Sequence, residues 1–103
     1  MPEARADQRG KRLDEIKRKI LPILKRHRAK RVGIFGSFAR GDQRKDSDID
    51  ILVELDKDID LLDFIGIQQE LEDILGRKVD LVEYDTIKPL IRERILKEQV
   101  VLI

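Results

Sequence analysis

The sequence predicts a small α/β (α+β) domain in which helices pack on a mixed sheet of about four strands. The chain has 103 residues, which is enough for one hydrophobic core and not for two. Its apolar residues alternate between short runs of strand type and longer segments with helical spacing. Capping and turn residues separate these segments. This alternation is typical of helices layered on a sheet.

The first two segments are a leader and a helix. Residues 1–10 are polar and lack periodicity, so we expect a flexible leader before a domain that spans residues 11–103. Apolar residues at helical spacing predict an amphipathic helix over residues 11–27. Pro22 inside it predicts a kink or the start of a new turn. His27 is the only histidine, and we expect it at the helix C-terminus rather than in a catalytic or metal site.

Two strands and a short helix are expected in the middle of the chain. The apolar run at residues 31–35 predicts a buried strand, which Gly36 and Ser37 interrupt. Residues 38–40 are expected to begin a short helix. Residues 48–55 then alternate between polar and apolar types, which predicts the second strand.

The remainder of the chain repeats the alternation of helix and strand. Asp60 is a good N-cap and Gly76 a good C′ residue for a helix over residues 61–75. The other expected elements are a strand at 77–83, a helix at 87–97 capped by Thr86, and a short apolar strand at 99–103 that finishes the core rather than pairing with another chain.

The second strand carries two carboxylates that should lie close together. Asp48 and Asp50 are two residues apart, so both point from the same face of the strand. Like charges this close are tolerated when a cation lies between them, and hard divalent ions favour carboxylate oxygens. The alternative is that both are ordinary surface acids. The opposite face of the strand is apolar and should fix their direction, through Ile49, Ile51, Val53 and Leu55.

The break after the first strand has the composition of a phosphate site. Gly36 allows close approach of the backbone, and a helix that opens at Ser37 would direct N–H groups at an anion. Arg40, one turn further on, contacts the same phosphates or stabilises the following turn. Arg44 and Lys45 lie in the next loop, where phosphate contact and simple solvation explain them equally well.

These motifs resemble a known superfamily. Gly36-Ser37, ten residues and then Asp48-x-Asp50 are similar to the signature of the DNA polymerase beta superfamily of nucleotidyltransferases. The longer string GSFARG…DSDIDILV resembles its smallest members, the minimal nucleotidyltransferase (MNT) family, which pair with HEPN proteins as antitoxins of toxin–antitoxin modules. The resemblance extends from about residue 11 to the end of the chain. It implies a polymerase-beta-like nucleotidyltransferase fold.

The resemblance also implies a set of site residues. A third acid on a neighbouring strand completes the metal site in this superfamily, and Asp80 is in the position to do so. It would bind the catalytic metal ion and act as general base; the alternative is a partly exposed strand residue. The implied cofactor is a pair of Mg²⁺ ions, or Mn²⁺, with ATP as substrate. The implied metal ligands are Asp48, Asp50 and Asp80, and the implied phosphate-binding residues are Gly36, Ser37 and Arg40.

The implied activity is transfer of AMP from ATP to a hydroxyl of a partner HEPN toxin, a tyrosine, which silences the toxin. A chain this short has no room for a domain that holds the acceptor, so a partner protein or a second copy of the chain must present it. The alternative is a non-catalytic antitoxin that neutralises its toxin by contact and only binds nucleotide. A stand-alone enzyme that acts on a small molecule or an RNA 3′ end is less favoured.

Composition narrows the remaining function classes. The first 45 residues hold 15 Lys and Arg against 5 Asp and Glu, so this half could attract a triphosphate, RNA or an acidic partner. It lacks interleaved aromatic residues, so direct nucleic-acid binding is not favoured. There is no cysteine and no apolar run of membrane-spanning length, which fits a cytoplasmic protein without membrane contact. Assembly into a homo-oligomer is left open.

Overall fold

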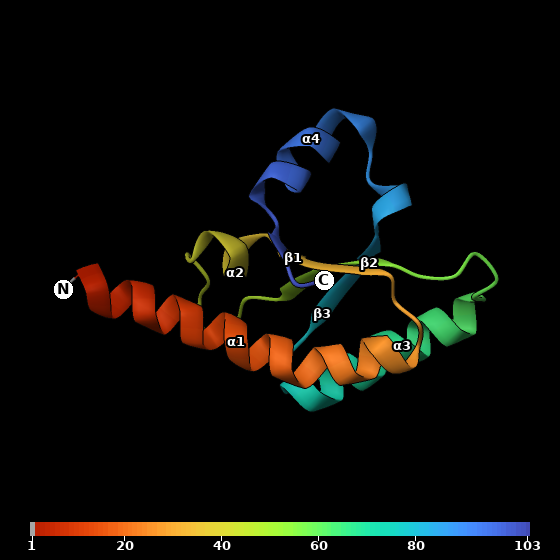
Figure 1. The fold of residues 1–103 in the computed structure, drawn as a ribbon, viewed down its shortest axis with the longest axis horizontal. Coiled ribbons are helices and arrows are strands. Elements are labelled where there is room, and N and C mark those ends of the chain that lie inside the picture. Colours follow the sequence, from red (N-terminus) through yellow and green to blue (C-terminus); the bar gives the residue numbers. More distant parts are fainter. Residues whose placement is uncertain (1) are drawn as a thin grey trace.

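The structure is a computed structural model that describes residues 2–103, with side chains for residue 10 and residues 12–103. Nearly all of the expected elements are present, in the expected order (Figure 1). In chain order they are α1 (Pro2–Arg26), β1 (Arg31–Phe35), α2 (Ser37–Arg40), β2 (Ile49–Glu54), α3 (Leu61–Leu75), β3 (Val79–Glu83), the 3₁₀ helix η1 (Tyr84–Thr86), α4 (Pro89–Glu98) and β4 (Val100–Val101).

The four strands form one mixed sheet in the order β3-β2-β1-β4. Strand β1 pairs antiparallel with both β2 and β4, whereas β2 and β3 are parallel. The parallel pair is possible because α3 crosses over between its strands. The predicted mixed sheet of about four strands is therefore confirmed.

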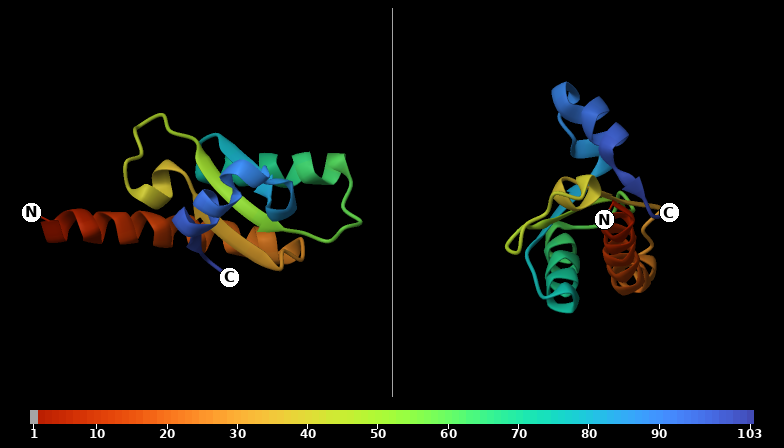
Figure 2. Two further views of the ribbon diagram at one scale, coloured as in Figure 1. Left: turned by 90° about the horizontal axis from the view of Figure 1, so that it is seen from above. Right: turned by 90° about the vertical axis from the view of Figure 1, so that its left-hand side faces the viewer.

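Helices cover the two faces of the sheet unequally. Helices α1 and α3 lie side by side on one face, and α4 lies on the other (Figures 1 and 2). The larger core lies between the sheet and the α1–α3 pair, and it includes the apolar face of β2 as expected. A smaller cluster lies under α4. Its buried members are Leu52, Tyr84 and Ile87, with Phe35, Val82, Ile95 and Leu96 packed against them.

Helix α1 differs from the expected helix at its N-terminal end. It begins at Pro2 rather than at residue 11, so the backbone of residues 2–10, which belong to the expected leader, is helical. Proline is tolerated in a first helical turn, and the Ala, Arg and Gln residues that follow favour helix even without an apolar stripe. The helix continues through Pro22 to Arg26. Within residues 2–103, no helix combines the length and the hydropathy needed to cross a bilayer.

The caps of α3 are as predicted, whereas the start of α4 is not. The Asp60 carboxylate accepts a hydrogen bond from the Asp63 amide, and Gly76 has the left-handed conformation at the C-terminal end. Thr86 does not cap α4, because it belongs to η1 and its hydroxyl donates to the Glu83 carbonyl. The N-cap position of α4 is occupied by Lys88, without a side-chain cap.

The C-terminal strand is shorter than expected. β4 spans two residues at the edge of the sheet beside β1. Val100 and Leu102 pack against the main core, so the prediction that this segment finishes the core is confirmed for them. Val101 is 61% exposed, because alternate residues of an edge strand point away from the core.

Candidate active site

The candidate acids Asp48, Asp50 and Asp80 lie on the α4 side of the sheet, near the N-terminal end of β2. Asp50 stands in register with Phe35 of β1 on one side and Asp80 of β3 on the other. Asp50 is half-buried, while Asp80 and Asp48, which immediately precedes β2, are exposed. Asp80 is therefore a largely exposed residue, but one placed directly beside Asp50.

Asp50 is the electrostatic centre of this group. Its pKa is raised from 3.8 to about 6, first by burial and then by the negative charges of Asp80 and Asp48. The Arg40 guanidinium lowers this pKa, and the Glu98 carboxylate raises it further. Asp50 thus sits in a field of like charge that a nearby cation would relieve.

The donor chemistry fits a divalent cation, although the side chains do not yet enclose one. Carboxylate oxygens are the ligands that Mg²⁺ and Mn²⁺ prefer, and the crowding around Asp50 would be relieved by such an ion. Among the described residues, no three acidic or histidine side chains are gathered closely enough to hold a metal ion as they stand. Asp48 and Asp80 are both exposed, and their charges already act on Asp50.

The raised pKa of Asp50 gives a testable effect on stability. The folded protein binds this proton more tightly than the unfolded chain, so the contribution of Asp50 to stability is largest below the ordinary pKa of 3.8 and is lost as pH rises through about 6. Above that pH, and without divalent ions, Asp50→Asn should increase the free energy of unfolding by about 1 kcal/mol, a value discounted for solvent screening of a half-buried group. Urea unfolding at pH 8 in chelator measures this difference.

The control for this prediction is Asp58→Asn. Asp58 is exposed beyond the other end of β2, so the same change there should leave stability unchanged. Adding Mg²⁺ should stabilise the wild-type protein more than the Asp50→Asn variant. A loss of stability in Asp50→Asn at pH 8 would contradict the electrostatic description of the site.

Gly36 brings the backbone directly against Asp50. It links β1 to α2 with φ 73° and ψ −150°, a conformation available essentially only to glycine. A Cβ atom on Gly36 would lie 2.0 Å from Oδ2 of Asp50. Ser37 follows as the first residue of α2 and is half-buried. The glycine-serine motif and the acid pair, ten residues apart in sequence, are therefore neighbours in space, as the motif predicted.

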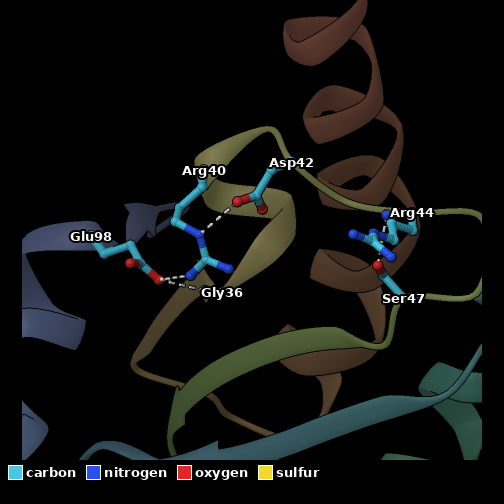
Figure 3. Close-up of polar contacts among 6 residues, drawn as sticks. All are labelled: Gly36, Arg40, Asp42, Arg44, Ser47 and Glu98. Carbon is cyan, nitrogen blue, oxygen red and sulfur yellow. Dashed lines mark hydrogen bonds and ion pairs between the residues drawn. The ribbon is translucent and has the colours of Figure 1, made fainter.

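An acid that the sequence analysis did not single out binds to this turn. Oε1 of Glu98, the last residue of α4, accepts a hydrogen bond from the Gly36 amide at 3.0 Å (Figure 3). The same oxygen accepts from Nη1 of Arg40 at 3.0 Å. Nε of Arg40 donates to Asp42 at 3.1 Å, so Arg40 both supports the turn after α2 and faces the Gly36 amide. These donors form a small site for an anion.

The two cations of the loop after α2, Arg44 and Lys45, line cavities that include neither Arg40 nor Glu98. The side chain of Arg44 is beside Ser47, away from Arg40 and Glu98 (Figure 3). Arg44 and Lys45 help to line a cavity of about 530 Å³ that also includes Arg12 of α1 and none of the candidate acids. Arg77 holds this loop by donating to the carbonyls of Lys45 and Ser47. Lys45 also lines a smaller cavity of about 280 Å³ together with Asp48, whereas Arg44 shares neither cavity with a candidate acid.

The geometry agrees with the comparison of the sequence with known families. Residues 18–103 match the family described as polymerase beta, nucleotidyltransferase. The chain belongs to this family. It is a nucleotidyltransferase of the minimal (MNT) type, and the fold expected from the motif is confirmed.

Relatives of this nucleotidyltransferase are found among archaeal proteins. It is 52% identical over 88 residues to MJ0435 of Methanocaldococcus jannaschii. The aligned region covers 85% of this chain and 95% of that protein. It is 41% identical over 78 residues to protein adenylyltransferase MntA of Thermococcus cleftensis, covering 76% of this chain and 79% of that one.

Solved structures extend the comparison. A toxin–antitoxin crystal structure with AMP-PNP matches the nucleotidyltransferase with a TM-score of 0.75 and 26% identity, over 84% of this chain and 72% of that one. A complex of tri-AMPylated Shewanella oneidensis HEPN toxin with MNT antitoxin matches with a TM-score of 0.69 and 22% identity, over 87% and 71% of the two chains, which shows a shared fold.

Proposed function

We propose that this nucleotidyltransferase transfers AMP from ATP to a tyrosine hydroxyl of a HEPN-type toxin and so acts as its antitoxin. The observation that carries the proposal is the meeting of two unlike groups at one end of the sheet. Asp50 and Asp80 supply adjacent carboxylates, and the Gly36 amide with Arg40 supplies anion-binding donors beside them. The names of MntA and of the toxin–antitoxin complexes support the same activity.

The proposed step is an in-line displacement at the α-phosphorus of ATP. The acceptor oxygen forms a bond to that phosphorus while the bond to the β-phosphate oxygen breaks, and pyrophosphate leaves with both electrons of that bond. The hydroxyl proton passes to Asp80, which we assign as general base. The Gly36 amide, the Ser37 hydroxyl and Arg40 would hold the β- and γ-phosphates. Catalysis would arise mainly from positioning and electrostatics.

We assign Asp48, Asp50 and Asp80 as the ligands of two Mg²⁺ ions, which Mn²⁺ could replace. When bound, the ions would supply charge neutralisation between the carboxylates and the phosphate oxygens. The protein's own part is to fix Asp50 by backing it with the apolar face of β2 and by pressing the Gly36 backbone against it.

Intact mass of the toxin tests the proposal. We expect the cognate HEPN-type toxin to gain one or more AMP units after incubation with this chain, ATP and Mg²⁺. The gain should be absent when the toxin's acceptor tyrosine is changed to phenylalanine, since only the hydroxyl can be modified. No gain with ATP, other nucleoside triphosphates or Mn²⁺ would overturn the assignment of the activity.

A contact-only antitoxin is the second candidate, and one observation favours it. The Gly36 amide and Arg40 donate to the Glu98 carboxylate, so the proposed phosphate-binding donors are engaged within the protein itself. A protein that neutralised its toxin by contact alone would need no turnover at this site. Neutralisation of the toxin by a catalytically inactive variant would distinguish this candidate from the enzyme.

A further inference from the structure

We propose that Glu98 is an internal competitor for the nucleotide: its carboxylate occupies the place of a phosphate oxygen and must leave when the triphosphate binds. The inference rests on the proposed function only in assuming that the site binds a nucleoside triphosphate. It assigns to Glu98 a regulatory part in that binding.

The contacts of Glu98 are those expected of a bound phosphate. One oxygen, Oε1, accepts from a backbone amide and from a guanidinium, each at 3.0 Å (Figure 3). Carboxylates and phosphates use the same donors, and charge-assisted bonds to them are among the strongest in proteins. Because both donors meet at one oxygen, a phosphate cannot reach Gly36 and Arg40 until Glu98 moves.

The fold explains why Glu98 reaches this turn. The antiparallel pairing of β1 with β4 places Val100 opposite Ile34, and Glu98, the last residue of α4, precedes Val100 by two residues, which brings it near Gly36. The chain beyond Glu98 is held firmly. Gln99 accepts a hydrogen bond from the Tyr84 hydroxyl at 2.6 Å, and its side chain fills the space over Gly33. The backbone of Glu98 is thus fixed, and release requires only rotation of its side chain.

The negative charges around Asp50 repel the Glu98 carboxylate, which keeps its contact with Gly36 and Arg40 reversible. Glu98 adds a further negative charge to those that already raise the pKa of Asp50. Its own side chain is 23% exposed, so a path to solvent is open. The helix that carries it, α4, buries no residue completely. Glu98 is therefore held by two good hydrogen bonds in a field that repels it, which suits a displaceable group.

Competition of this kind weakens nucleotide binding by a predictable factor. The apparent dissociation constant equals the intrinsic constant divided by the fraction of molecules in which the site is free. If Glu98 occupied the site in nine molecules of ten, its removal would tighten binding about tenfold.

The test is calorimetric titration of Mg²⁺ and AMP-PNP into the whole chain and two variants. Glu98→Ala removes the carboxylate and should bind AMP-PNP about tenfold more tightly. Glu98→Asp keeps the charge, but its side chain is one methylene shorter and reaches less far toward Gly36 and Arg40. This variant should therefore also bind AMP-PNP more tightly than the wild type. The control, Glu93→Gln, removes a charge from the same helix at an exposed residue paired with Lys97, and should leave the affinity unchanged.

The other outcomes distinguish failure of this proposal from failure of the proposed function. Unchanged or weaker binding in Glu98→Ala at an unaltered melting temperature would show that Glu98 does not compete. A gain in Glu98→Ala without one in Glu98→Asp would indicate a general effect of charge. If Glu98→Ala failed to fold, the affinity of Glu98→Asp alone would test whether Glu98 competes. If no variant bound AMP-PNP, the proposal that Gly36 and Arg40 bind phosphate would be wrong. Tighter binding without AMP transfer to the toxin would support Glu98 and contradict only the proposed function.

Discussion

Replacement of Asp48 and Asp50 together by asparagine is expected to lower the rate of AMP transfer by about a thousandfold or more. Asparagine has nearly the same shape, so the side chains should still fit beside Gly36 and Asp80. What is lost is the negative charge that would bind divalent ions, and with it neutralisation of the phosphates. The two acids act as a unit, so the double variant should be little worse than either single one. Single-turnover transfer of AMP to the toxin, followed by intact mass, measures the effect.

A matched control removes the same charge elsewhere. Asp58→Asn/Asp73→Asn changes two exposed acids outside the site and should transfer AMP at the wild-type rate. The Asp48→Asn/Asp50→Asn protein should melt no lower than the wild type in chelator, since Asp50 is strained by like charge there. Retained transfer in a folded double variant would remove these residues from the catalytic site. Loss of transfer with full neutralisation of the toxin would favour the contact-only antitoxin.

The candidate site was predictable where its geometry follows from local rules. Strand periodicity alone places Asp48 and Asp50 opposite the buried face of β2, and the structure has Ile49 and Ile51 in the core as required. The positive φ of Gly36 likewise suits its residue type, although the group that lies against it is the Asp50 carboxylate, whereas the expected approach was to a phosphate. Both features depend on a few neighbouring residues, whose preferences the sequence displays directly.

Features that depend on pairing between distant segments were not predictable in this way. Glu98 meets Gly36 because β4 pairs with β1, and a two-residue strand carries almost no register information of its own. The face of the sheet that α4 covers also depends on contacts between distant segments, so it could not be predicted from the sequence either. The start of α1 was missed for a different reason: the segment has adequate helix propensity but no apolar stripe to reveal it.

Gly36→Ala is expected to disable the site and to destabilise the fold. The substitution forces an L-residue into a conformation with φ 73° and ψ −150°, which costs about 1–3 kcal/mol. The new Cβ would also lie 2.0 Å from Oδ2 and 3.0 Å from Cγ of Asp50, so Asp50 must turn away from its position beside Asp80. We therefore expect lower stability and loss of AMP transfer together. Urea unfolding and transfer to the toxin measure the two effects.

Gly66→Ala is the matched control. Gly66 lies in the middle of α3 with nothing within 4 Å of its added Cβ, so alanine should increase stability by up to about 1 kcal/mol without affecting transfer. A second comparison isolates the contact with Asp50. If the clash is real, the stability cost of Gly36→Ala should be smaller in an Asp50→Ala background than in the wild type, since the opposing carboxylate is gone. Equal costs in both backgrounds would mean that the backbone conformation alone requires glycine. Gly36 would then shape the phosphate turn without positioning the acid, and the link between the two halves of the site would be lost.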